Sequence, residues 1–417
     1  MASLARRNLV EDIPRFLVAQ AGIMFAVSLV TIQTGILNGF SRSTVLLIDN
    51  SPADIWVASD KMVQFELTEP IIADQVNQAK RVEGVARAEA LMRGSGVWQP
   101  EEGEISPLTF IGFDPNGQLF QPGNLVAGNI KDLAKPYNIM VDKGRLPTLR
   151  IDKLGDRAQI KSLPAQLVAI TTESQSLTAS PFIFTSLENV NAYVNADFTS
   201  RVDCKLQPDR QVKCTTIYER KDTTKETETS LPPTPQPLTS TDPISYILIG
   251  AEPGQDLEQL KARLEASLPA TRAYTREEMS EKTRDYWLNR TGIGFILTLG
   301  ATVGVIVGMV VVSQILYSSV SDHIKEFGTL KAMGAPDRVI YSVIIEQSLW
   351  MAILGYLPGI LGCWGISAWA TTQGVIILIT PLSALAVLGV TIGMCVGSAF
   401  FAIQKVTRID PGIVFKA

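Results

Sequence analysis

Side chains that could carry acid–base or nucleophilic chemistry are scarce in this chain of 417 residues. The single histidine, His323, argues against a histidine-based triad and excludes a zinc site with two histidines. Ser95 stands between two glycines, but with no histidine to activate it we interpret residues 93–96 as a kink in a strand. Neither G-x-x-x-x-G-K-[ST] nor G-x-S-x-G occurs. The sequence therefore predicts no catalytic residue, no metal site and no cofactor.

The four cysteines are the remaining reactive side chains. Cys363 and Cys395 lie in long apolar stretches, where a thiol is usually a small packing residue. Cys204 and Cys214 are ten residues apart in a region with strand character, and an oxidising compartment would allow them to pair. Spacing alone does not fix disulfide geometry, so a bridge between Cys204 and Cys214 and two free thiols are both open.

Long stretches with almost no charged residues predict membrane-spanning helices, two of which contain Cys363 and Cys395. Only 19% of the residues are charged, against about a quarter in an ordinary soluble protein. A helix needs roughly 20 residues to cross about 30 Å of hydrocarbon. These stretches predict four membrane-spanning helices at 16–38, 292–320, 341–370 and 381–403, and the one charged residue within them, Glu346, is near the cytoplasmic end of the third.

The lysines and arginines of the short segments predict the orientation of these spans. They gather in the N-terminus (1–15), in the connection between spans two and three (321–338) and in the tail (404–417), so these segments are expected in the cytoplasm. Residues 39–291 are then external, and the first span is an uncleaved anchor. This block is mildly acidic, which argues against a nucleic-acid partner.

Alternating strand and helix patterns predict the fold of the external domain. The first group of predicted elements consists of strand 53–59, helix 69–82 capped by Thr68, and strands 85–98 and 108–113. A long insertion separates it from the second group, which consists of strand 244–249, helix 255–268 and strand 270–274. This order is typical of a split βαβ sandwich, so segments of about 50–115 and 243–275 form one porter-like subdomain. Residues of about 116–242 form an inserted, mostly β lobe, in which the Thr/Ser/Pro-rich segment 221–243 is a flexible loop.

The predicted fold class is an α-helical membrane protein with four transmembrane helices and a large external α+β domain. Residues 39–49 and an amphipathic helix at 276–290 join this domain to spans one and two. They either form a helical stalk or are solvated helix ends, with Tyr286 and Trp287 as an aromatic belt at the membrane surface.

The cytoplasmic connection 321–338 is the most informative segment. Its apolar residues recur every third position, which predicts a short amphipathic helix along the membrane face. Residues 326–335 read EFGTLKAMGA and resemble the signature E-[IF]-G-x-L-[KR]-A-[LM]-G-A of the FtsX/MacB-type (type VII) ABC transporter permeases. The plan of one span, a large periplasmic domain and three further spans is similar as well, and the N-terminal residues resemble the DevC branch from cyanobacteria.

This resemblance implies a permease subunit without enzymatic activity of its own, and a separate cytoplasmic ABC ATPase that binds the ATP. The permease would be a homodimer in the inner membrane, in contact with membrane lipids. In the DevC branch it works with a membrane-fusion adaptor and a TolC-like outer-membrane protein and exports a lipophilic substrate such as a glycolipid. The residues that the resemblance assigns to ATPase coupling are Glu326, Gly328, Lys331, Gly334 and Ala335.

Two further questions are open at this stage. Gly300, Gly304 and Gly308 place a small residue at every fourth position of span two, which suits either a dimer-packing face or contact with span one or four. The same layout also fits a lipoprotein-releasing permease, or an FtsX-like regulator that activates a periplasmic hydrolase without transport.

Overall fold

A computed structural model describes most of the chain. It covers residues 13–100, 104–176, 180–196, 198–206, 212–220, 232–322, 329, 333, 336–372 and 376–407. For residues 15, 198–206, 212–220, 322, 337, 372, 402 and 404–407 it gives the backbone alone. The chain divides into two compact units, which we call the helical unit (Met1–Phe40 and Thr291–Ala417) and the mixed unit (Ser41–Arg290).

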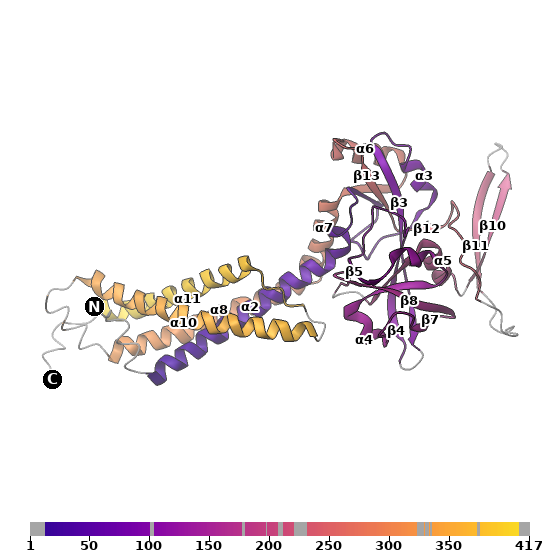
Figure 1. Cartoon of the computed structure of the whole chain (residues 1–417). Coiled ribbons are helices and arrows are strands. Elements are labelled where there is room, and N and C mark those ends of the chain that lie inside the picture. Colours follow the sequence, from indigo (N-terminus) through magenta and orange to yellow (C-terminus); the bar gives the residue numbers. More distant parts are fainter. Residues whose placement is uncertain are drawn as a thin grey trace. The chain divides into compact units, whose positions relative to one another are not determined.

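The helical unit contains the four long helices (Figure 1): α2 (Ile13–Asp49, the part up to Phe40), α8 (Ile293–Asp322), α10 (Asp337–Thr372) and α11 (Pro381–Thr407). All four are long and apolar enough to cross a membrane, which confirms the prediction of four spans. Their shared core includes Ile23, Val312 and Ile344. At 1.5 Å per residue α2 is about 55 Å long, well beyond the hydrocarbon thickness, so its last residues belong to the mixed unit.

A ten-stranded sheet forms the centre of the mixed unit. Its strands run in the order β14-β1-β13-β3-β4-β9-β6-β8-β5, and β7 pairs with β3 and β8. The strands are β1 (Ile55–Ser59), β3 (Val85–Pro100), β4 (Ser106–Phe113), β5 (Asn124–Gly128), β6 (Asn138–Asp142), β7 (Arg157–Ile160), β8 (Leu163–Thr172), β9 (Phe182–Ser186), β13 (Tyr246–Ala251) and β14 (Thr271–Thr275). A short pair, β2 (Ile71–Ile72) and β12 (Pro243–Ile244), lies outside this sheet.

Short helices accompany these strands. They are α3 (Asp74–Ala79), α4 (Leu146–Leu149), α5 (Leu187–Val194), α6 (Leu257–Ser267) and α7 (Arg276–Asp285), with 3-10 turns at Ile130–Ala134 and Lys143–Arg145. A π-helical turn (Tyr286–Arg290) follows α7 directly. The helix predicted at 276–290 is thus confirmed.

The split βαβ prediction is confirmed by the strand order. β13, from the second group of elements, lies between β1 and β3 of the first and is antiparallel to both. β14 closes the other side of β1. Because β1 and β13 are each paired on both sides and are buried along almost their whole length, they are the central strands of this subdomain.

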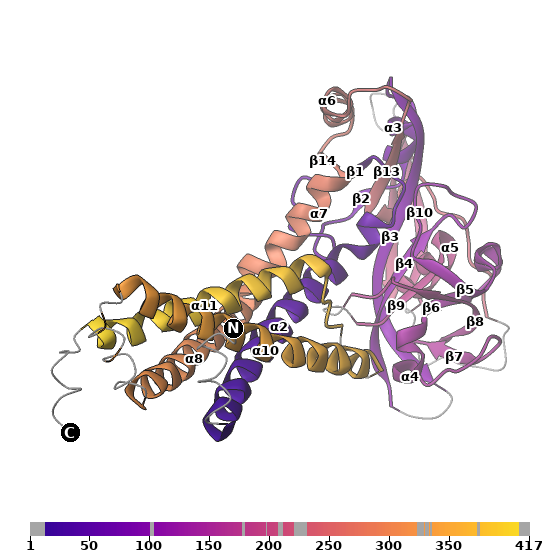
Figure 2. The ribbon, with the colours of Figure 1, turned by 60° about the vertical axis from the view of Figure 1, so that its left-hand side comes forward.

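Strand β3 continues from this subdomain into the sheet of the inserted lobe, which β4 also joins by pairing with β9 (Figure 2). Residues 85–91 pair with β13, and residues 92–98 pair with β4 without a register shift. The kink predicted at 93–96 is therefore wrong. The glycines make room instead: a Cβ on Gly94 would come within 2.6 Å of Val194, and one on Gly96 within 2.7 Å of the Phe110 ring.

Two local predictions need correction. The helix predicted at 69–82 is reduced to α3, because Ile71 pairs with Ile244 as a strand, and Thr68 caps no helix. The loop predicted at 221–243 is held to the fold in its second half: Tyr137 donates a hydrogen bond to the Pro233 carbonyl, and Leu238 packs on a buried cluster. Residues 221–231 lie outside the described part of the chain.

The two remaining strands, β10 (Phe198–Leu206) and β11 (Val212–Arg220), form a separate antiparallel ribbon (Figure 1). Together with β5 to β9 and α5, they make residues 116–242 a mostly β lobe, as predicted.

Candidate functional site

The predicted ATPase-coupling residues Glu326, Gly328, Lys331, Gly334 and Ala335 lie outside the described part of the chain. Helix α8 ends at Asp322 and α10 begins at Asp337, so these residues occupy the connection between the second and third long helices. The site that the structure does describe is in the mixed unit, where the segments that lead to and from the spans meet the sheet.

Helix α7 is anchored to residues 41–51 by packing and by polar contacts. Met279 is fully buried in a cluster with Val45 and Ile48 of α2. The hydroxyl of Ser280 donates a 2.5 Å hydrogen bond to Asp49. The chain segments that enter and leave the mixed unit therefore form one packed pair, as a stalk requires.

Helix α7 is also attached to the sheet through its first residues. Its N-cap is Thr275, the last residue of β14, whose hydroxyl accepts from the Glu278 N–H while the Glu278 carboxylate accepts from the Thr275 N–H at 2.8 Å. This reciprocal capping box fixes the direction in which α7 leaves the strand. The N–H of Arg276 donates to the Asp54 carbonyl, just before β1.

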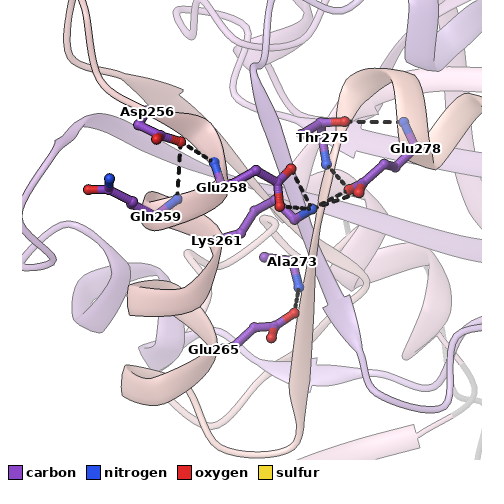
Figure 3. Close-up of polar contacts among 8 residues, drawn as sticks. All are labelled: Asp256, Glu258, Gln259, Lys261, Glu265, Ala273, Thr275 and Glu278. Carbon is purple, nitrogen blue, oxygen red and sulfur yellow. Dashed lines mark hydrogen bonds and ion pairs between the residues drawn. The ribbon is translucent and has the colours of Figure 1, made fainter.

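An ion pair joins α7 to α6 at the same point (Figure 3). The Lys261 ammonium lies 2.7 Å from both carboxylate oxygens of Glu278 and 3.1 Å from Glu258. The Lys261 side chain is only 13% exposed, whereas that of Glu278 is 43% exposed. Asp256 caps the start of α6, and Glu265 accepts from the Ala273 N–H of β14. We call α6, β14 and α7 with these contacts the joint.

The charges of the joint stabilise each other. Burial alone would lower the pKa of Lys261, but the carboxylates of Glu278 and Glu258 outweigh it, so the pKa of Lys261 is raised. Burial alone would raise the pKa of Glu278, but the Lys261 ammonium and the Thr275 N–H outweigh it, so the pKa of Glu278 is lowered. Both groups are therefore charged at neutral pH.

An open cleft of about 660 Å³ lies beside α7. Met62 and Val63 give it an apolar side, and Tyr274 and Tyr286 add aromatic rings. Its remaining lining residues are polar or charged: Glu278, Glu281, Lys282, Asp285, Asn289 and Arg290. The cleft thus offers apolar and charged contacts within one volume of the size that small molecules occupy.

The glycine face of α8 contacts other helices of the same chain. A Cβ on Gly304 would come within 2.6 Å of Leu29, and one on Gly308 within 2.6 Å of Ala26 and 2.4 Å of Met394. Gly300 similarly approaches Gln33. These contacts are those expected for the alternative of packing against spans one and four.

Sequence reasoning located α7 but missed the joint. The pattern Thr275-x-x-Glu278 is a capping box that can be found from the sequence. The contact of Lys261 with Glu258 has the three-residue spacing of a pair within one helix, but its contact with Glu278 gave no signal, because Glu278 is on the next helix along the chain. Within the described residues, no group of three or more His, Cys, Asp or Glu side chains is arranged to hold a metal ion.

Two family descriptions match the sequence. Residues 16–267 match the MacB-like periplasmic core domain, and residues 298–411 match the FtsX-like permease C-terminal domain. The first match alone covers more than half of the chain.

Two curated relatives match shorter stretches. The uncharacterized ABC transporter permease MJ1507 of Methanocaldococcus jannaschii is 25% identical over 179 residues, which are 40% of this chain and 44% of that protein. The macrolide export ATP-binding/permease protein MacB of Hyphomonas neptunium is 28% identical over 126 residues, which are 30% of this chain and 20% of that protein. The matches thus span less than half the length of either relative.

Two solved structures are similar to part of this chain at low identity. The periplasmic region of MacB from Actinobacillus actinomycetemcomitans has a TM-score of 0.33 and 10% identity, covering 55% of this chain and 92% of that one. The extracellular domain of the transporter YknZ from Gram-positive bacteria has a TM-score of 0.32 and 11% identity, covering 53% and 98%.

Proposed function

Because the chain belongs to the FtsX/MacB-type family of ABC transporter permeases, we propose that it couples ATP hydrolysis on a separate ATPase to a movement of its periplasmic domain that drives export. It is a multi-pass inner-membrane protein, and the mixed unit is its periplasmic domain. The 417 residues contain no phosphate-binding G-x-x-x-x-G-K-[ST] loop, so the proposal assigns ATP binding to a partner chain.

The joint is the observation that carries this proposal. Residues 41–49 follow span one without a break in α2, and residues 276–290 lead into span two. Both segments pack on each other, and α7 is bonded to β14 and α6. Within the mixed unit, residues 41–49 are therefore connected to the edge strand β14 through α7 by packed and hydrogen-bonded contacts.

The finer parts of the proposal concern partners and cargo. We assign ATPase binding to the connection that holds Glu326 to Ala335, a homodimer as the working unit, and an adaptor with a TolC-like duct as the route outward. The cargo is a lipophilic molecule such as a glycolipid. The mixed apolar and polar lining of the cleft beside α7 supports a substrate of this amphipathic kind.

Charge reversal and steric bulk in the connection test the coupling. We expect Lys331→Glu or Gly334→Trp to abolish stimulation of the partner ATPase in reconstituted vesicles, because the first reverses the charge of a residue assigned to ATPase coupling and the second puts a bulky side chain at a glycine assigned to it. Lys405→Glu, which reverses a charge in the cytoplasmic tail, is the matched control and should leave stimulation intact.

Membrane insertion and yield of all three variants are measured first, so that loss of folding is recognised. Normal stimulation in the Lys331→Glu and Gly334→Trp variants would contradict the coupling assignment. Equal loss in the Lys405→Glu variant would show that the effect is not specific to the connection.

A further inference from the structure

The β10–β11 ribbon brings two cysteines into register. The two strands pair from Phe198↔Arg220 to Leu206↔Val212 without a shift, and this register places Cys204 directly opposite Cys214. The ribbon is a two-stranded sheet of its own and shares no ladder with the ten-stranded sheet. Its sequence therefore has to stabilise it locally.

Direct opposition in an antiparallel pair satisfies the distance requirement of a disulfide. Opposite residues have Cα atoms about 4.5 or 5.5 Å apart, depending on whether the pair is hydrogen-bonded. Both values fall within the range of about 4.4–6.8 Å seen between disulfide-bonded cysteines. Opposite residues also share one face of the ribbon.

Each cysteine of the pair has only one partner available within its own unit. The chain has four cysteines, and the other two, Cys363 and Cys395, are buried free thiols in the helical unit. Because the mixed unit is periplasmic, the pair is exposed to an oxidising compartment.

The ribbon also has a reason to need a covalent link. A two-stranded ribbon is marginally stable in water. Next to the cysteines, the register places Lys205 opposite Lys213, and like charges in direct opposition weaken a strand pair. A bond between positions 204 and 214 would hold the strands together at this point of repulsion.

We propose that Cys204 and Cys214 form a disulfide that holds the β10–β11 ribbon in its folded register. The bond forms by exchange with the disulfide of a periplasmic thiol oxidase. One cysteine thiolate attacks a sulfur of the donor disulfide, and the second thiolate displaces the donor from the mixed disulfide. The donor takes up the electron pair and the two protons and leaves as a dithiol.

Peptide mapping of the full-length protein from native membranes tests this pairing. Free thiols are first blocked with N-ethylmaleimide, and the protein is then digested with trypsin without reduction. Cleavage after Arg201, Lys205, Lys213 and Arg220 releases the peptides 202–205 and 214–220. We expect these two peptides to appear linked, and to separate on reduction with a gain of two hydrogen atoms in total mass.

The alternatives give different maps. Both peptides recovered with a maleimide group, or either one linked to a small thiol or to its own copy from another chain, would overturn the pairing. Cys363→Ser with Cys395→Ser is the control and should leave the linked peptide unchanged.

A second measurement tests the stabilising role. The variant Cys204→Ser with Cys214→Ser should be cleaved by limiting trypsin within residues 198–220 faster than the unreduced wild type, while cleavage elsewhere keeps its rate. Equal cleavage rates in the ribbon would refute the role of the bond in holding the register.

Discussion

At the scale of single residues, the balance between burial and pairing decides what Lys261 contributes. Its side chain is largely removed from water, which is unfavourable for a charged side chain that has no partner. Two carboxylates compensate for this, and Glu278 in turn accepts the Thr275 N–H. Because the Glu278 side chain is 43% exposed, solvent screens much of the attraction, and the pair contributes about 1 kcal/mol or less.

We expect Lys261→Met to lower the stability of the periplasmic domain by about 1 kcal/mol, because Glu278 and Glu258 lose their shared partner. The lowered pKa of Glu278 means that its contribution is complete above pH 4.5 and is lost as the pH falls through the lower folded value. The raised pKa of Lys261 means that its contribution is complete below pH 10.5 and is lost as the pH rises through the higher folded value. Thermal unfolding of the full chain at a series of pH values measures both effects.

The matched control is Lys80→Met, which removes an exposed lysine for which the described residues provide no ion pair. The drop in the unfolding midpoint below pH 4.5 should be smaller in Lys261→Met than in the wild type. A pH profile identical to that of the wild type would contradict the role of the pair.

At the scale of elements, the two threonines that resemble helix caps behave differently. Thr68 precedes a stretch with helical character, yet the chain there forms β2 before the short helix α3. Thr275 ends a strand and caps α7 with both halves of a capping box. The difference arises because Ile71 finds a strand partner in Ile244, more than 170 residues away along the chain.

We expect Thr275→Ala to destabilise the periplasmic domain by about 1 kcal/mol, because the Glu278 N–H loses its acceptor at the start of α7. Thr234→Ala, at an exposed threonine, is the control and should be neutral. Chemical denaturation followed by far-UV circular dichroism measures the difference between the two. An equal effect of both substitutions would show that the cap is not important.

The elements that the sequence predicted correctly are those with a strong local pattern. The long apolar helices, β3, β4, β13 and α6 were found because their patterns of apolar residues extend over whole elements. Local patterns carry no information on contacts between residues that are distant in the chain. Such contacts are the pairing of β2 with β12, the ion pair of Lys261 with Glu278 and the packing of Leu238 on its buried cluster. The Thr/Ser/Pro composition of residues 221–243 predicted a loop, but not that tertiary contacts hold its second half.

At the scale of the whole molecule, the described residues form separate cores in the two units. One cluster joins α2, α8, α10 and α11, and three others fill the mixed unit. A change in one core is therefore expected to act on that unit first.

We expect Gly308→Val to destabilise the helical unit, because the added Cβ would lie 2.6 Å from the Ala26 Cβ and 2.4 Å from the Met394 sulfur, closer than non-bonded atoms pack. Gly389→Val is the control, since a Cβ at that position meets nothing within 4 Å. Proteolysis in detergent micelles distinguishes the units: new cleavage should arise in the long helices of Gly308→Val, while residues 41–290 resist as in the wild type. Loss of resistance in residues 41–290 alone would contradict separate cores.

The 16 residues of β3 have a consequence for protein engineering. Because one uninterrupted backbone belongs to both the split βαβ subdomain and the inserted lobe, a chimera that exchanges the lobe with that of a relative must be spliced inside a strand. An offset of one residue at the splice turns every donor side chain beyond it to the opposite face. In a functional graft, each donor side chain must therefore lie on the same face of the sheet as the residue that it replaces in positions 85 to 100. Candidate donors can be sorted by this rule before any gene is synthesised.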